Sequence, residues 1–136
     1  MMEGVVFLAR KPQRGDVVVF KTDGIALIPA RQFWVKRIVG EPGDHVQIAN
    51  GKLLINEVET TLSNRLGAIT YQLPPNTGPM PALHLDVWVP RDSFFVLGDN
   101  SANSFDSRFW GFVPAKNVMG RTSFCYWPPH RIGGVK

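Results

Sequence analysis

The sequence has little of what several common protein classes require. Its single cysteine, Cys125, excludes an internal disulfide. The histidines His45, His84 and His130 lie far apart without paired ligand spacing, so we expect no metal site. No apolar run approaches the ~20 residues of a membrane-spanning helix, and no signal-peptide pattern opens the chain. We therefore expect the chain itself to be soluble, with any membrane anchor lying outside it.

The charge balance is basic, with 15 Lys and Arg against 11 Asp and Glu. The basic residues are scattered, apart from a cluster at Arg10, Lys11 and Arg14 and the adjacent pair Lys36 and Arg37. No module of basic and aromatic residues accompanies them, so nucleic acid is not an expected partner. A mildly basic surface beside a membrane fits this charge better.

Short β-prone runs between turn residues predict a mostly β fold. Thirteen Gly and eleven Pro are spread along the chain, which suits short strands joined by turns. Helix signals are nearly absent, apart from one possible turn near residues 114–117. The expected strands are residues 5–9, 17–20, 33–39, 45–48, 52–55, 86–89, 93–97 and 120–127.

The pattern loosens between residues 59 and 85, where four prolines oppose regular strand structure. We therefore predict a β core formed by residues 1–49 and 91–136. Residues 50–90 would be inserted in it as a small lobe or flap.

Lys36 is the most informative residue, because it lies within an apolar strand. Residues two apart in a strand share a face, so Lys36 points the same way as Trp34 and Ile38. Such a lysine either extends its amine to a sheet edge or stays partly buried. Burial lowers a lysine pKa by as much as ~3–5 units, and a neutral amine can act as a general base.

The polar segment from Gly98 to Arg108 is the second candidate for chemistry. It is rich in hydroxyl, amide and carboxylate groups and follows an apolar strand. One interpretation is a solvated loop stabilised by Asx and Ser turns. The other is a device that holds an amine by hydrogen bonds, with an ion pair among Asp99, Asp106 and Arg108 as its support.

Three segments, in this order, resemble the sequence boxes of bacterial type I signal peptidases, which are serine/lysine-dyad endopeptidases. They are residues 14–20 (RGDVVVF), 35–44 (VKRIVGEPGD) and 98–114 (GDNSANSFDSRFWGFVP). The ending at residues 126–133 is also similar to that family. One departure lies at Ser101 and Ala102, where the family commonly carries an Arg-Asp pair. Since exposed ion pairs contribute little, we expect a small effect on the chemistry.

The resemblance implies the fold of that family, a core of antiparallel β-sheets, and specific roles for residues in these boxes. Lys36 would be the general base, and Ser104 would hydrogen-bond its amine and orient it. The supporting polar positions would be Asp99, Asn100, Asp106 and Arg108. The positions beside the substrate pockets would be Val19, Trp34 and Val35.

The implied function is removal of signal peptides from exported preproteins. The catalytic region would lie on the extracytoplasmic face of the cytoplasmic membrane, with the longer protein associated with that membrane. Signal peptides of the Ala-x-Ala type would bind as an extended strand, and no metal or organic cofactor would be needed.

The family's nucleophilic serine lies in a Ser-Met-x-Pro-like box upstream of the Arg14 segment, and here no serine precedes Ser63. We expect an N-terminally trimmed chain that does not cleave by itself. The alternative is a natural non-catalytic relative, such as a peptide-binding accessory protein in secretion or pilus assembly. A self-cleaving repressor domain with a similar Ser/Lys core is a second alternative, which neither residues 35–44 nor 98–108 favour.

Overall fold

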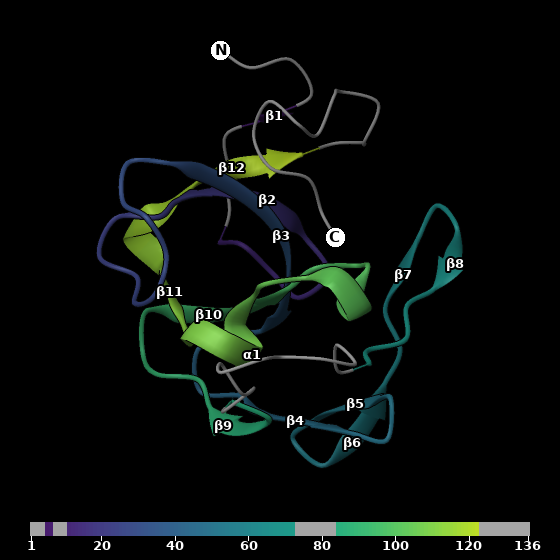
Figure 1. The fold of residues 1–136 in the computed structure, drawn as a ribbon. Helices are drawn as coiled ribbons and strands as arrows, with labels where there is room; N and C mark the ends of the chain where they lie inside the picture. The colour runs from purple at the N-terminus through teal and green to yellow at the C-terminus, as the bar shows by residue number, and fades with distance from the viewer. Residues whose placement is uncertain (1–4, 7–10, 73–83, 123–136) are drawn as a thin grey trace.

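The structure is a computed structural model that describes residues 5–6, 11–72 and 84–122 (Figure 1). The predicted ends of the first and last strands, Cys125, His130 and the family-like ending at 126–133 lie outside the described residues.

Strands dominate this part of the chain, as predicted, and every strand pairing is antiparallel. The strands are β1 (Val5–Val6), β2 (Val17–Lys21), β3 (Phe33–Gly40), β4 (His45–Ala49), β5 (Lys52–Ile55), β6 (Val58–Thr60), β7 (Ser63–Asn64), β8 (Gly67–Ala68), β9 (Asp86–Trp88), β10 (Ser93–Leu97), β11 (Val113–Pro114) and β12 (Val118–Thr122). The short helices are η1 (Ser101–Asn103), α1 (Ser107–Trp110) and η2 (Ala115–Asn117). The prediction of a mostly β, antiparallel fold is therefore confirmed.

A six-stranded sheet in the order β1-β12-β2-β3-β10-β11 positions the candidate site. Its central strands β2 and β3 are rich in Val and Ile, which suits a pleated surface that is buried on both faces. Val18 pairs with Lys36 and Val19 pairs with Val35, so the register places each pair on one face of the sheet.

A four-stranded sheet in the order β6-β5-β4-β9 lies below the first sheet in Figure 1. Asn50 and Gly51 form the predicted tight turn between β4 and β5, and both have positive φ angles (53° and 78°). This sheet begins at His45, whereas the expected inserted lobe begins at residue 50. The division of the chain into core and lobe stays a prediction.

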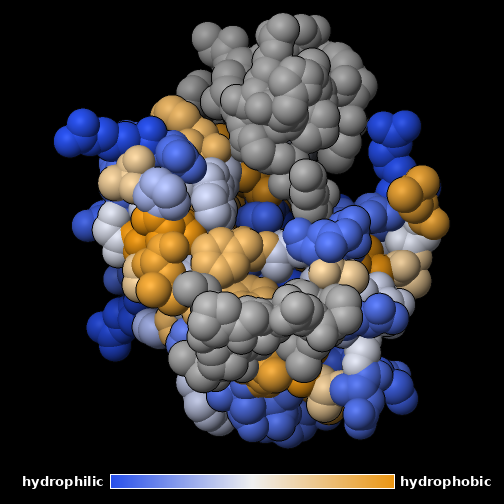
Figure 2. Space-filling model, viewed as in Figure 1, coloured by the Kyte–Doolittle hydropathy of each residue, from blue (hydrophilic) through white to orange (hydrophobic). Residues whose placement is uncertain are grey.

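Strand β10 separates two hydrophobic cores, because its successive side chains point to opposite faces. Phe94 and Val96 pack with residues of β2 and β3, beside α1. Phe95 and Leu97 pack with the four-stranded sheet. Figure 2 shows that apolar side chains gather near the middle of the displayed face, with hydrophilic ones toward its edges.

Four short strands (β6, β7, β8 and β11) and the helices η1 and α1 were not predicted. The strands contain two or three residues each, too few to show an alternating pattern. Helix α1 has four residues and begins inside the segment that we expected to be a loop. None of the helices in the described part of the chain is long and apolar enough to cross a membrane.

A histidine links three elements of the four-stranded sheet. His45 contacts Glu57 through Nδ1 at 2.7 Å and Asp86 through Nε2 at 2.6 Å. Its ring also stacks on Trp88, with 4.4 Å between the centroids. The hydrogen bonds to Asp86 and Glu57 raise the pKa of His45, and the bond from His45 lowers the pKa of Asp86.

We expect this ion pair to make stability depend on pH. The folded-state pKa of His45 is raised, so its contribution is complete below the unfolded-state pKa and is lost as pH rises through the folded-state pKa. His45→Gln should therefore lower the thermal unfolding midpoint at about pH 5.5 and change it little at about pH 9. Equal losses at both pH values would show that the imidazolium is not what stabilises the sheet.

Gly40 ends β3 at a point where no side chain fits. An added Cβ would lie 2.7 Å from Val46 Cγ2, 2.9 Å from Val89 Cγ2 and 3.1 Å from Phe95 Cβ. Overpacking of this kind costs about 1–3 kcal/mol, so Gly40→Ala should lower the free energy of unfolding by that amount in urea denaturation. The control Val58→Ala changes a side chain that is 64% exposed and should stay within about 0.5 kcal/mol. Similar values for the two variants would contradict the close packing at Gly40.

Candidate functional site

Lys36 is buried, with only 7% of its surface exposed, although it carries an amine. As predicted, it shares a face of β3 with Trp34 and Ile38. The amine lies 5.8 Å from the centroid of the Trp34 ring and donates a hydrogen bond to Ser104 Oγ at 3.3 Å. We gave two alternatives for this lysine, an amine extended to a sheet edge or an amine that stays buried. The structure shows the buried amine.

Aromatic rings form the apolar surroundings of Lys36 on this side of the sheet. Trp34 makes edge contacts with Phe105 and Trp110, with centroids 6.5 and 6.3 Å apart. Trp110 donates its indole N–H to the backbone carbonyl of Phe105 at 3.1 Å, which fixes the orientation of the indole ring. Phe105 and Trp110 were not predicted as site residues, since their separation from Lys36 in the sequence gives no signal.

Ser104 reaches Lys36 because the chain turns sharply just before it. The helix η1 ends at Asn103, and the backbone of the next residue, Ser104, is extended (φ −105°, ψ 130°). The residue is only 3% exposed. The structure therefore brings together the two predicted residues that lie 68 positions apart.

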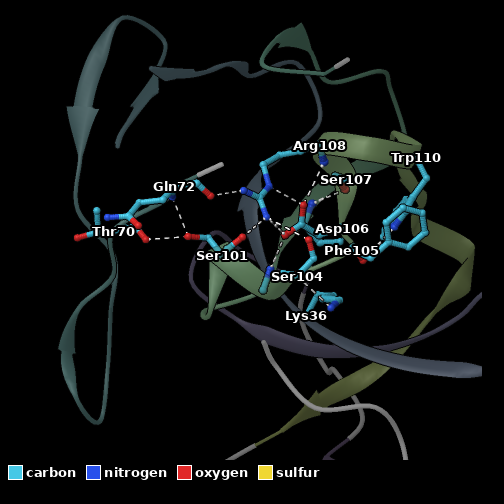
Figure 3. Close-up of polar contacts among 12 residues, drawn as sticks. Lys36, Thr70, Gln72, Ser101, Ser104, Phe105, Asp106, Ser107, Arg108 and Trp110 are labelled. Carbon is cyan, nitrogen blue, oxygen red and sulfur yellow. Dashed lines mark hydrogen bonds and ion pairs between the residues drawn. The ribbon is translucent and has the colours of Figure 1, made fainter. Parts of the chain in front are cut away.

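Asp106 and Arg108 form the predicted ion pair, and both side chains are fully buried (Figure 3). Asp106 Oδ1 accepts from Arg108 Nε at 2.8 Å, and Oδ2 accepts from Arg108 Nη2 at 3.0 Å. The carboxylate also accepts from the backbone N–H of Arg108, which caps α1, and from that of Gly98. The pair thus holds both ends of the polar segment.

Arg108 uses its remaining N–H groups to bind backbone carbonyls from two parts of the chain. Nη2 donates to Ser101 O at 2.7 Å and to Ser104 O at 3.2 Å. Nη1 donates to Gln72 O at 2.6 Å. One guanidinium therefore fixes the backbone around Ser104 and the segment that follows β8 (Figure 3).

Asp99 pairs with Arg37, and this corrects the predicted group of Asp99, Asp106 and Arg108. Asp99 accepts from Arg37 Nε and Nη2 at 2.8 and 2.7 Å and from Asn64 Nδ2 at 3.1 Å. The reason is alternation along β3, which directs Arg37 away from the Lys36 face. Leu97 pairs with Arg37 across the sheet, so Asp99 lies two residues beyond it. The sequence does contain a feature that could have identified Arg37, because it is the second charged residue in a mainly apolar strand.

The other predicted positions do not all lie on the same side of the sheet as Lys36. Val19 and Val35 are cross-strand partners on the face of the sheet opposite Lys36, and both are buried. Trp34 alone among the predicted substrate-binding residues shares the lysine's face. Asn100 precedes η1, is exposed, and does not cap that helix with its side chain. Contact of these residues with a peptide stays a prediction.

Two further features concern charge and polarity near the site. Tyr71 is buried, its hydroxyl has no hydrogen-bond partner among the described residues, and burial, with Asp99 nearby, raises its pKa. Within residues 5–6, 11–72 and 84–122, no three His, Cys, Asp or Glu side chains are placed to hold a metal ion. The group at this site that could take part in a reaction is thus a buried amine that is hydrogen-bonded to a hydroxyl.

Known proteins resemble the chain over nearly its whole length. The family described as "Signal peptidase, peptidase S26" matches residues 1–127. A probable thylakoidal processing peptidase 2 of Arabidopsis thaliana is 37% identical over 98% of this chain and 34% of its own length. A signal peptidase I of Leptolyngbya laminosa is 37% identical over 98% of this chain and 62% of its own length. The chain thus spans less than two thirds of these curated relatives.

A solved structure shows the same similarity in three dimensions. The crystal structure of a signal peptidase I from Enterococcus faecalis V583 aligns with a TM-score of 0.58 and 30% identity. The alignment covers 84% of this chain and 98% of the other.

We expect the buried ion pair to be essential for the fold of the polar segment. Asp106→Asn keeps the shape of the side chain but leaves the Arg108 cation buried without its counter-charge. Losing one partner of a buried pair costs about 3–5 kcal/mol, to be measured as the free energy of unfolding. The matched control is Glu59→Gln, which breaks the exposed pair with Lys52 and should cost less than about 1 kcal/mol. Comparable losses in the two variants would refute this assignment.

Proposed function

Because the chain belongs to the signal peptidase family, peptidase S26, we propose that it supplies the general-base half of a serine endopeptidase. The enzyme would remove signal peptides from exported preproteins. One observation carries the proposal: the Lys36 amine is buried beside the Trp34 ring and hydrogen-bonded to Ser104.

The proposed reaction is acyl transfer to a serine and then to water. The serine hydroxyl, carried by a segment that the family places upstream, attacks the scissile carbonyl. Neutral Lys36 takes the hydroxyl proton and gives it to the leaving amine, so that an ester with the serine remains. Lys36 then takes a proton from the attacking water and returns it to the serine oxygen as the ester bond breaks, so the acid product leaves and the serine and the neutral amine are restored.

The surroundings of Lys36 support this role. Burial beside Trp34 disfavours the charged form of an amine, and the bond to Ser104 fixes the direction of its lone pair. The Arg108 guanidinium, which donates to the Ser104 carbonyl, is neutralised by its ion pair with Asp106.

The proposed substrate is an extended peptide with small residues of the Ala-x-Ala type before the scissile bond. Main-chain hydrogen bonds would provide much of the binding, and small pockets would exclude large side chains. The proposed location is the extracytoplasmic face of the cytoplasmic membrane, where exported preproteins emerge.

The test uses a polypeptide in which the serine-bearing segment of the Leptolyngbya laminosa enzyme precedes residue 1, with cleavage of an Ala-x-Ala peptide as the measurement. Lys36→Met should lower kcat by about 10²–10⁴-fold, because the general base is lost. Ser104→Ala should lower it by about 10–100-fold, because the amine is no longer oriented. The control Lys52→Met removes an exposed lysine and should leave the rate unchanged.

Two results would overturn the proposal. Cleavage by Lys36→Met at the parent rate would remove the lysine from the mechanism. Tight binding of the peptide without cleavage by the parent polypeptide would instead assign the chain to peptide-binding accessory proteins.

A further inference from the structure

Ser101 is buried, although neighbouring residues in the chain are exposed. We expected the departure from the family's Arg-Asp pair at Ser101 and Ala102 to lie on the surface and to matter little. Instead, Ser101 is only 4% exposed, between the exposed residues Asn100 and Asn103. Its hydroxyl is buried against the segment Thr70–Gln72, which comes from a distant part of the chain (Figure 3).

The Ser101 hydroxyl takes the place of a neighbouring strand. It donates to Thr70 O at 3.0 Å and accepts from Gln72 N at 2.7 Å. A carbonyl and the N–H two residues later point to the same edge of an extended segment, where a paired strand would normally satisfy both. A hydroxyl is both donor and acceptor, so this one side chain satisfies the two groups together.

The opposite side of the same segment is attached to the four-stranded sheet. Tyr71 donates its backbone N–H to Gly51 O at 3.3 Å, in the turn between β4 and β5. The Tyr71 ring packs into the hydrophobic core of that sheet. Thr70–Gln72 therefore connects the four-stranded sheet to the polar segment that carries Ser104.

A short path of contacts leads from Ser101 to the amine. Ser101 O and Ser104 O both accept from Arg108 Nη2, and Ser104 Oγ accepts from Lys36. We propose that Ser101 is a positioning residue that fixes Ser104, and through it the Lys36 amine, by holding the polar segment against Thr70–Gln72. This inference rests on the proposed function, because the proposed function is what makes the positioned amine a general base.

The test measures the amine directly in the 136-residue chain, without any need for cleavage. Lysine labelled with ¹³C at Cε reports the titration midpoint of each amine by NMR, and Lys36→Met identifies the Lys36 signal. In Ser101→Ala the amine loses its fixed, buried position and becomes better hydrated. We expect its midpoint to rise by about half a pH unit or more, since hydration favours the ammonium form. The Gln72 amide should also exchange with solvent at least about 10-fold faster.

Conservative and control variants separate positioning from general stability. Ser101→Thr keeps the hydroxyl and should restore the midpoint to within about 0.2 pH units of the parent. Ser63→Ala changes an exposed serine and should leave it unmoved. None of these variants alters a side chain of the ion pairs Arg37–Asp99 and Arg108–Asp106.

The outcomes distinguish this inference from the proposed function. A parent-like midpoint in folded Ser101→Ala would overturn the positioning role and leave the function of Lys36 intact. If Ser101→Ala does not fold, the same midpoint is measured in Ser101→Cys, which keeps the shape of the side chain but forms weaker hydrogen bonds. A parent-like midpoint in folded Ser101→Cys would then overturn the positioning role. Conversely, a raised midpoint in Ser101→Ala combined with full cleavage by Lys36→Met would support the positioning contact and refute the peptidase mechanism.

Discussion

The buried pair between Arg108 and Asp106 is the interaction on which the candidate site depends. A guanidinium excluded from water needs a carboxylate and several further acceptors, and this one finds them in backbone carbonyls from two parts of the chain. The need to satisfy one cation therefore dictates the path of the whole polar segment. The position of Ser104, and hence that of its contact with Lys36, follows from that path.

The fold was predictable wherever a strand carries its own pattern. The runs of Val and Ile in β2 and β3 and the Asn-Gly turn after β4 identify their structures locally. The helix α1 was not predictable, because its four residues form around the buried Asp106 carboxylate and have no helical periodicity of their own. Strands of two or three residues are likewise defined by their partners more than by their sequences.

The site was predictable to the extent that its residues lie in segments with a known family resemblance. That resemblance identified Lys36, Ser104, Asp106 and Arg108, and the structure brings these side chains together. It did not reveal the pairing of Asp99 with Arg37, because that depends on which face of β3 each residue occupies relative to β10. Nor did it reveal the burial of Ser101, which depends on a segment about thirty positions earlier in the chain.

Strand β10 is buried on both faces, so it contributes side chains to two hydrophobic cores. Phe95 and Leu97 fill one core while Phe94 and Val96 fill the other, so neither core is complete without the same five-residue backbone. Closely packed interiors transmit small displacements instead of absorbing them. We therefore expect the two sheets to unfold as a single cooperative unit, and a change in side-chain volume on one side of β10 to disturb the packing on the other.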